Sequence, residues 1–214
     1  MHYTLPMQQV RPRRSQEERK QETRKQLLDT ATTLLIERGM SALTTTAICR
    51  EAGLSQGALF KHFETKHLML CAIAEHLYDF IVAEFEASID ALQSRPSLDE
   101  TIEHLAKYFD TPQVRAVYDF HTAARVDPEL RDTLQECQQK HAENIAACAL
   151  RLLPEYTSHP KFPAAVYTVI MLLQGSTVAG MVRRPADQHR LFLDFIKETA
   201  RLWLEAPLGE QNCE

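Results

Sequence analysis

The sequence has few of the features on which enzymes and secreted proteins depend. Glycine accounts for only six of 214 residues, and this scarcity argues against a fibrous repeat or bulk disorder. The five cysteines are scattered without a CxxC pair, so we expect neither a disulfide framework nor paired cysteine ligands. HExxH and a phosphate-binding glycine loop are absent, and the nine histidines are dispersed. We therefore expect no enzyme activity, no metal and no cofactor.

Signals for export and membrane insertion are also weak. The N-terminal residues MHYTLPMQQVRPRR lack the apolar core of a signal peptide, which favours a cytoplasmic protein. Residues 162–182 carry no charge and approach the roughly 20 apolar residues that cross a bilayer. Pro163, Gln174, Ser176 and two glycines interrupt this run. A helix buried in a soluble assembly is therefore favoured over a membrane span, and no membrane partner is expected.

The net charge of −5 is divided unevenly along the chain. Residues 1–65 carry ten Lys and Arg against seven Asp and Glu, whereas residues 66–214 carry 14 against 22. A basic segment on an acidic remainder is expected when only one end of a protein meets phosphates. An architectural DNA-binding protein without ligand control would need basic charge along its whole body, so the acidic remainder argues against that class.

Hydrophobic spacing predicts an all-α protein of about nine helices. We divide the chain into a flexible basic arm (1–15), a three-helix domain (16–65), a larger helical domain (66–206) and a tail (207–214). Capping residues, prolines and apolar stripes place the helices at 16–38, from Thr44 or Thr45 to Ala52, from Ser55 to about Phe63, from Thr65 to about Leu92, and then after Ser97, Thr111 and Asp127, at 163–182 and from Ala186.

A short helical hairpin is predicted within CREAGLSQGALFKHF, residues 49–63. Gly53 can adopt a positive φ and turn the chain sharply, and Ser55 can cap the helix that follows. Helices this short gain stability only by packing on each other and on the first helix. The pattern indicates a helix-turn-helix, whose second helix can enter a DNA major groove. The side chains that it would present are those of Gln56, Gly57, Ala58, Phe60, Lys61 and His62.

Residues 27–70, LLDTATTLLIERGMSALTTTAICREAGLSQGALFKHFETKHLML, resemble the DNA-binding domain of the TetR family of transcriptional regulators. The resemblance covers about a fifth of the chain. It implies a homodimer with a recognition helix at 55–62 and a C-terminal domain that dimerises and binds a ligand. It also implies a sequence-specific repressor that leaves its double-stranded operator DNA when a small, mostly hydrophobic effector binds. The alternative is an activator or a ligand-independent DNA-binding protein of the same fold.

The resemblance also suggests roles for individual residues of the DNA-binding domain. It implies phosphate contacts from Thr44 or Thr45 and from Lys66. Base or groove contacts are implied for a second set, which comprises Ser55, Gln56, Ala58 and His62. Many members carry tyrosine where this chain has Phe60, which cannot donate a hydrogen bond to a phosphate.

The N-terminal arm has two possible interpretations. Arg11, Arg13 and Arg14 could enter a minor groove, where negative potential is concentrated. Glu17, Glu18 and Glu22 follow closely in the sequence and favour a solvated tail instead.

The helices near 163–182 and 187–204 are predicted to dimerise as a four-helix bundle, with burial inside the monomer as the alternative. Gly175 and Gly180 would permit close approach there. A mainly hydrophobic ligand cavity is predicted between the fourth helix and the helices near 112–125, 130–150 and 163–175. Its candidate ligand-binding residues are His76, Tyr118, His121, Arg125, His141, Tyr167, Met171 and Gln174.

Overall fold

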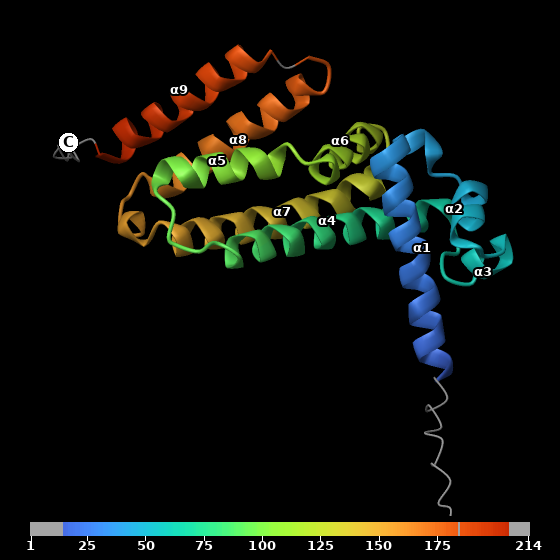
Figure 1. Ribbon diagram of the computed structural model, residues 1–214. Helices are drawn as coiled ribbons and strands as arrows, with labels where there is room; N and C mark the ends of the chain where they lie inside the picture. Colours follow the sequence, from blue (N-terminus) through green and yellow to red (C-terminus); the bar gives the residue numbers. More distant parts are fainter. Residues whose placement is uncertain (1–14, 184, 206–214) are drawn as a thin grey trace, which may run out of the picture.

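The computed structural model describes residues 15–183 and 185–205, and these form nine α-helices, two short 3-10 turns and no β-strand (Figure 1). This confirms the predicted all-α fold. The arm with Arg11, Arg13 and Arg14 and the tail 207–214 lie outside the described residues. The helices are α1 (Gln16–Arg38), α2 (Thr45–Ala52), α3 (Gln56–Phe60), α4 (Lys66–Asp90), α5 (Leu98–Phe109), α6 (Pro112–Ala124), α7 (Pro128–Leu152), α8 (Phe162–Gly180) and α9 (Ala186–Glu205).

Local capping sets where most of the helices begin. In seven of them a Ser, Thr or Asp side chain accepts a hydrogen bond from a backbone N–H three residues further on, which satisfies one of the unpaired amides at a helix start. Ser15 and Ser97 form full capping boxes with Glu18 and Glu100. Pro112 and Pro128 occupy the first helical position, where no amide hydrogen is needed.

Helices α1 to α3 form a small head with its own core. Leu35, Ile48 and Leu59 are fully buried there. The predicted third helix is too long by about three residues, because α3 ends at Phe60 and the chain then turns. This turn inserts Phe63 into the core beneath the guanidinium of Arg24, which lies 5.3 Å from the ring centre.

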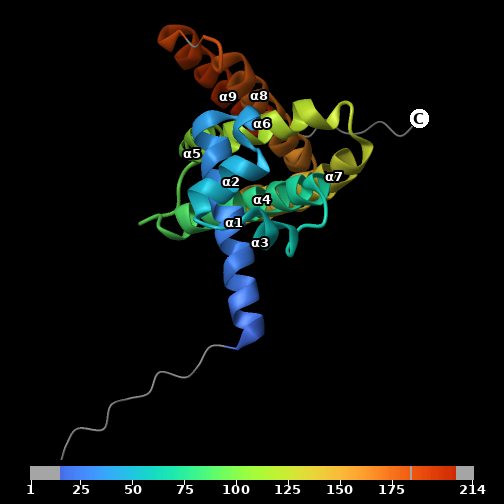
Figure 2. The same cartoon turned by 90° about the vertical axis from the view of Figure 1, so that its right-hand side faces the viewer.

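Helices α4 to α9 form the body of the molecule. Helices α4 and α7 lie side by side, while α8 and α9 form an outer pair at the top of both views (Figures 1 and 2). Ile73 and Leu77 of α4 have no exposed surface, as its predicted apolar stripe requires. Phe80 follows Ile73 and Leu77 at helical spacing, which predicts burial, but its side chain is 38% exposed.

Two polar contacts join the head to the body. The backbone N–H of Met40 donates to the carboxylate of Asp119 in α6 at 3.2 Å. In addition, α1 and α4 pair through Asp29 and His76 (described below). The head is therefore attached to α4 and α6 at separate points. Within the body, the ring of His67 at the start of α4 lies 3.1 Å from the carboxylates of both Asp127 and Glu129, which joins α4 to the start of α7.

We expect Gly53→Ala to destabilise the protein by about 1 kcal/mol, because Gly53 has the left-handed φ of 66°. An added Cβ would meet no atom within 4 Å, so the cost is in the backbone alone. Gly57→Ala is the matched control, since its added Cβ makes only an ordinary contact with Ser55 inside α3. Urea unfolding at one protein concentration measures the free energy of unfolding of both variants. Equal stabilities for the two variants would contradict the role given to Gly53.

Candidate nucleic-acid interface and ligand cavity

Helix α3 turns one side to the head core and the other to solvent. Leu59 is buried, while Ser55, Gln56, Gly57 and Lys61 are exposed and Phe60 is 45% exposed. Ala58 is half-buried, and its N–H is capped by the Ser55 hydroxyl. The amide of Gln56 donates to the hydroxyl of Thr46 at 2.9 Å, which ties α3 to the exposed start of α2. Thr46 was absent from the sequence-based set, because a threonine inside a helix gives no signal for such a contact.

The residues predicted to bind phosphates lie at helix starts beside α3. Thr44 is exposed and caps α2, and Thr45 is the half-buried first residue of that helix. Lys66 is the exposed first residue of α4. Neither Lys61 nor Lys66 forms an ion pair with another residue in the described ranges, so both ammonium groups face solvent. Exposed lysines of this kind suit a phosphate backbone.

His62 is less accessible than the sequence suggested. It follows α3 in the turn, where it is half-buried, and its Nδ1 is covered without a hydrogen-bond partner among the described residues. Burial lowers the pKa of His62, and the charges of Lys20 and Arg24 lower it further. The ring is therefore neutral at pH 7, and only one edge of it remains for DNA.

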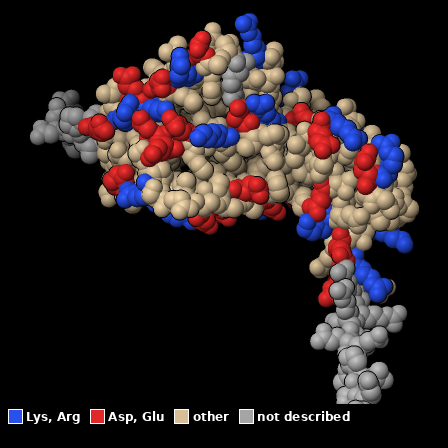
Figure 3. Space-filling model, viewed as in Figure 1, with Lys and Arg blue, Asp and Glu red and all other residues tan. Residues whose placement is uncertain are grey.

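The described part of the head carries no formal net charge. Residues 15–65 contain equal numbers of basic and acidic side chains, so the predicted excess resides in Arg11, Arg13 and Arg14. In the view of Figure 3, both signs are interspersed over head and body. The Glu51 carboxylate lies 3.2 Å from Arg38 and from Arg50, and these pairs remove a negative charge from the surface of α2.

The largest cavity described in the body has a volume of about 700 Å³ and lies between α4, α5, α6, α7 and α8. Its place agrees with the cavity expected from the sequence, and its size is typical of a site for a small molecule. Six of the eight candidate ligand-binding residues line it, namely Tyr118, His121, His141, Tyr167, Met171 and Gln174.

The other two candidates lie elsewhere. The Nε2 atom of His76 is 2.8 Å from the Asp29 carboxylate, so this ring joins α4 to α1 and faces the head. Arg125 is exposed just after α6 and lines no part of the cavity. Both residues were chosen as polar groups on otherwise apolar helix faces, and sequence spacing does not show which neighbour such a face meets.

Some lining residues were missed. Gln135, Gln138 and Gln139 are exposed on α7 and border the cavity. In the sequence they are indistinguishable from an ordinary solvated helix face. Tyr78 of α4, a polar residue that the sequence places on an otherwise apolar helix face, also lines the cavity.

Two hydrogen-bonded groups cross the interior of the body. In the first, Nε2 of His121 lies 3.1 Å from the Tyr78 hydroxyl and 3.1 Å from the side-chain amide of Gln138. In the second, the Tyr108 hydroxyl donates to the carbonyl of Ile81 at 3.3 Å and lies 3.4 Å from Nε2 of His141. Burial raises the pKa of both tyrosines, lowers that of His121 and lowers that of His141 to about 4.

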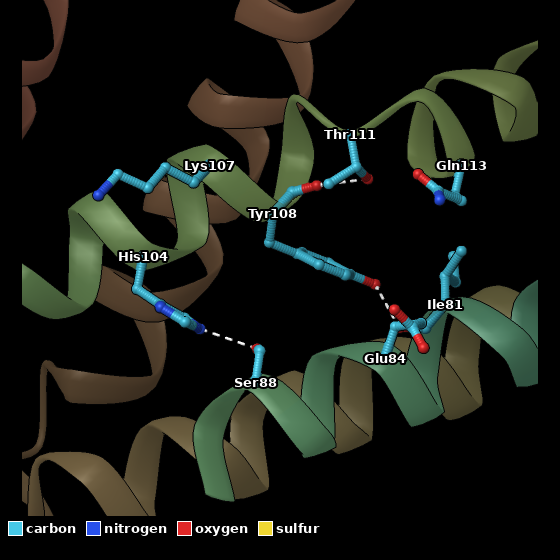
Figure 4. Close-up of a pocket in the computed structure, with 8 residues that line it drawn as sticks. All are labelled: Ile81, Glu84, Ser88, His104, Lys107, Tyr108, Thr111 and Gln113. Carbon is cyan, nitrogen blue, oxygen red and sulfur yellow. Dashed lines mark hydrogen bonds between the residues drawn. The ribbon is translucent and has the colours of Figure 1, made fainter. Parts of the chain in front are cut away.

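A smaller cavity of about 270 Å³ lies between α4 and α5 (Figure 4). Figure 4 shows Tyr108 projecting from α5 toward α4, with His104 and Ser88 to one side at a hydrogen-bond distance of 2.9 Å. Ile81 lines both cavities. Lys107 and Glu84 give this second cavity the charged side chains that the larger one lacks.

An apolar surface covers the outer pair of helices. On α9, Leu191, Phe195 and Leu202 are each more than 60% exposed, and Tyr167 of α8 is 65% exposed. An added Cβ on Gly175 would meet nothing within 4 Å, so α8 is open to close approach. Among the described residues, α8 is also the one helix long and apolar enough for a membrane span, a property that interface helices of soluble proteins share.

Groups typical of catalysis are not assembled in the described part of the chain. No cluster of three or more His, Cys, Asp or Glu side chains there could hold a metal ion. Cys49, Cys71, Cys137 and Cys148 are buried and free. The architecture is instead that of a helix-turn-helix head on a helical body that contains a cavity and exposes an apolar face.

Comparison with known proteins places this architecture in a family. The family described as "Bacterial regulatory proteins, tetR family" matches residues 27–73. An HTH-type transcriptional regulator of Mycobacterium tuberculosis is 29% identical over 176 residues, which cover 80% of this chain and 90% of the relative. The HTH-type transcriptional regulator CymR of Pseudomonas putida is 30% identical over 130 residues, which cover 60% and 64%.

Solved structures show the same fold. A transcriptional regulator from Saccharomonospora viridis in complex with choline superposes with a TM-score of 0.63 at 17% identity, over 87% of this chain and 97% of that one. The matched domain, the relatives and the solved structures together support a regulator of the TetR family.

The buried imidazole of His141 predicts a loss of stability in mild acid. An unfolded histidine binds a proton below about pH 6.5, whereas His141 binds one only below about pH 4. The stabilising contribution is therefore complete above pH 6.5 and is lost as the pH falls toward 4. Between pH 8 and pH 5 we expect the free energy of unfolding of the wild-type protein to fall by about 2 kcal/mol more than that of His141→Phe. Urea unfolding at each pH measures both values. If the unfolding free energies of the two proteins changed with pH in parallel, His141 would not be buried as a neutral ring.

Proposed function

We propose that this TetR-family protein is a cytoplasmic transcriptional repressor that binds operator DNA as a homodimer and leaves it when a small, mostly apolar molecule enters the main cavity. One observation carries the proposal: α4 begins beside the recognition helix with Lys66 and lines the cavity with Tyr78 and Ile81. The two sites therefore share one continuous helix.

The distance between the two sites along α4 is short. Lys66 and Tyr78 are separated by about 18 Å at the rise of an α-helix. Between them, Ile73 and Ala74 have no exposed surface, so the inward face of the helix is closely packed. A displacement of α4 at the cavity is expected to move its first turn as well, because a closely packed helix transmits strain.

Helix α6 offers a second connection. Tyr118 and His121 line the cavity, and Asp119, between them in sequence, accepts the N–H of Met40 in the head. A ligand that shifts α6 would change this hydrogen bond. Ligand binding lowers DNA affinity only to the extent that the ligand prefers the conformation in which the heads fit DNA poorly.

The apolar surface on α8 and α9 supports dimerisation. Large exposed apolar patches on soluble proteins mark interaction sites, and a two-fold axis through this pair would form a four-helix bundle. Two recognition helices about 34–36 Å apart can then read successive major grooves on one side of the duplex. A single α3 of five residues covers too few base pairs for useful affinity.

The direct test of the function is binding to the DNA that flanks the protein's own gene. We expect binding at low salt and release by a compound that enters the cavity. Lys61→Ala and Lys66→Ala should each weaken binding to all sequences and reduce the salt slope by about one. Gln56→Ala should change the preferred sequence instead.

Lys140→Ala removes an exposed lysine from α7 and serves as the control for lost charge. If the wild-type protein bound no fragment at low salt, or if Lys140→Ala weakened binding as much as Lys61→Ala, the proposed recognition surface would be wrong.

A glutamate on the apolar face should separate the dimer. Phe195→Glu places a charge at a position 62% exposed in the single chain, where an interface would bury it. We expect light scattering to show a monomer and operator affinity to fall at least tenfold. Leu150→Glu changes an exposed leucine on α7, away from this face, and should remain a dimer. A dimeric Phe195→Glu would refute this interface.

A further inference from the structure

The main cavity combines many polar groups with an absence of formal charge. None of the residues that line it is Asp, Glu, Lys or Arg. Its polar groups are tyrosine hydroxyls, glutamine amides and two imidazoles, and the rest of the lining is apolar. The smaller cavity, by contrast, is lined by both Glu84 and Lys107.

Burial keeps the titratable groups of the cavity neutral. It lowers the pKa of His141 to about 4 and that of His121 in the same direction, so neither ring carries a charge at pH 7. It raises the pKa of Tyr118 to about 12 and that of Tyr78 as well, so these hydroxyls keep their protons. The cavity therefore offers hydrogen bonds but no counter-ion.

The hydrogen bonds of His141 define its tautomer. The Tyr108 hydroxyl has one proton and donates it to the Ile81 carbonyl at 3.3 Å. The bond of 3.4 Å between this hydroxyl and Nε2 of His141 then requires the imidazole to donate. In a neutral ring protonated at Nε2, Nδ1 is a hydrogen-bond acceptor.

This acceptor has no donor in the described part of the chain. His141 is only 6% exposed, and its Nδ1 is covered without a partner. Buried polar atoms are normally hydrogen-bonded, and an unpaired one is costly. Since His141 lines the cavity, a donor can come from a molecule that enters it and moves the side chains over the ring.

Two residues of the cavity wall, Tyr78 and Gln138, offer hydrogen-bond donors. Both the Tyr78 hydroxyl and the Gln138 amide lie 3.1 Å from Nε2 of His121. As an acceptor, this nitrogen has a single lone pair, so only one of the two groups can donate to it fully. A donor is thus left over for a ligand. The ring centres of Tyr78 and His141 are 5.9 Å apart, and both residues line the cavity.

We propose that the effector of this protein is an uncharged, largely apolar alcohol or phenol whose hydroxyl donates to Nδ1 of His141 and accepts from Tyr78 or Gln138. This deepens the proposed function, since it assumes that the cavity is the effector site. A hydroxyl group meets both requirements with one atom, whereas a ketone or an ether lacks the donor.

The same lining disfavours charged effectors. An anion such as a carboxylate would lose its hydration without gaining a cation, and burial of an unpaired charge is strongly unfavourable. Nδ1 of His141 would also face the anion with a lone pair. A cation would find no carboxylate among the lining residues.

The test compares three probes of similar shape on the full-length protein. These are 2-naphthol, its methyl ether 2-methoxynaphthalene, and 2-naphthoate, and their affinities are measured by isothermal titration calorimetry. We expect 2-naphthol to bind at least tenfold more tightly than either of the others, because only it can satisfy the buried acceptor without introducing a charge.

Two variants identify the contacts. His141→Phe keeps an aromatic ring but removes the acceptor, so the preference for 2-naphthol over its ether should disappear. Tyr78→Phe removes one hydroxyl and should reduce 2-naphthol binding several-fold. His104→Phe removes a partly buried histidine outside this cavity and should retain the wild-type ratio. Thermal unfolding of each variant checks that it is folded.

The proposal is overturned if 2-naphthoate binds most tightly, if none of the probes binds at millimolar concentration, or if folded His141→Phe and Tyr78→Phe both keep the wild-type preference. Operator binding, measured in parallel, separates the two hypotheses. Release of DNA by 2-naphthoate but not by 2-naphthol would leave the repressor intact and refute the effector class. Selective binding of 2-naphthol without any operator binding would refute only the repressor.

Discussion

The burial of α4 is the constraint on which the rest of the structure depends. Its middle turns have no exposed surface at Ile73, Ala74 and Leu77, because α1 covers one side and α6 and α7 cover the others. The helix therefore cannot shift at one end without disturbing neighbours at the other. Since its first residue, Lys66, lies beside α3 and its fourth turn contributes Tyr78 to the cavity, the packing of one helix relates the two candidate sites.

The polar interior of the body depends on the same packing. Tyr78, Tyr108 and His141 are buried between helices, and their hydrogen bonds are made with one another, with His121 and with the carbonyl of Ile81. Such a group selects for hydrogen-bonding geometry and against charge, because the low-dielectric surroundings penalise any unpaired ion. Exposed Tyr167 and Leu191 show the opposite situation on the outer face, where apolar side chains lack a cover within the chain.

Much of the fold and part of the site could be predicted because their signals are local. Ser55 and Ser97 mark helix starts through bonds to amides three residues away, and Gly53 marks the sharp turn of the head. The prediction was less successful for contacts between residues that are far apart in the sequence. The polar residue His76 pairs with Asp29, which is 47 positions away, and Gln138 of α7 meets His121 of α6 at the cavity edge.

The sequence by itself determined the number and approximate limits of the helices, the helix-turn-helix head and the resemblance to the TetR family. These features depend on caps, turns and spacing within a few residues, and short-range hydrogen bonds and sterics are sufficient to specify them. Only the tertiary structure decided which polar side chains share a cavity, which imidazole nitrogen lacks a partner and which apolar stripe remains uncovered. Those outcomes depend on how helices distant in sequence pack together, and periodicity within a single helix does not contain that information.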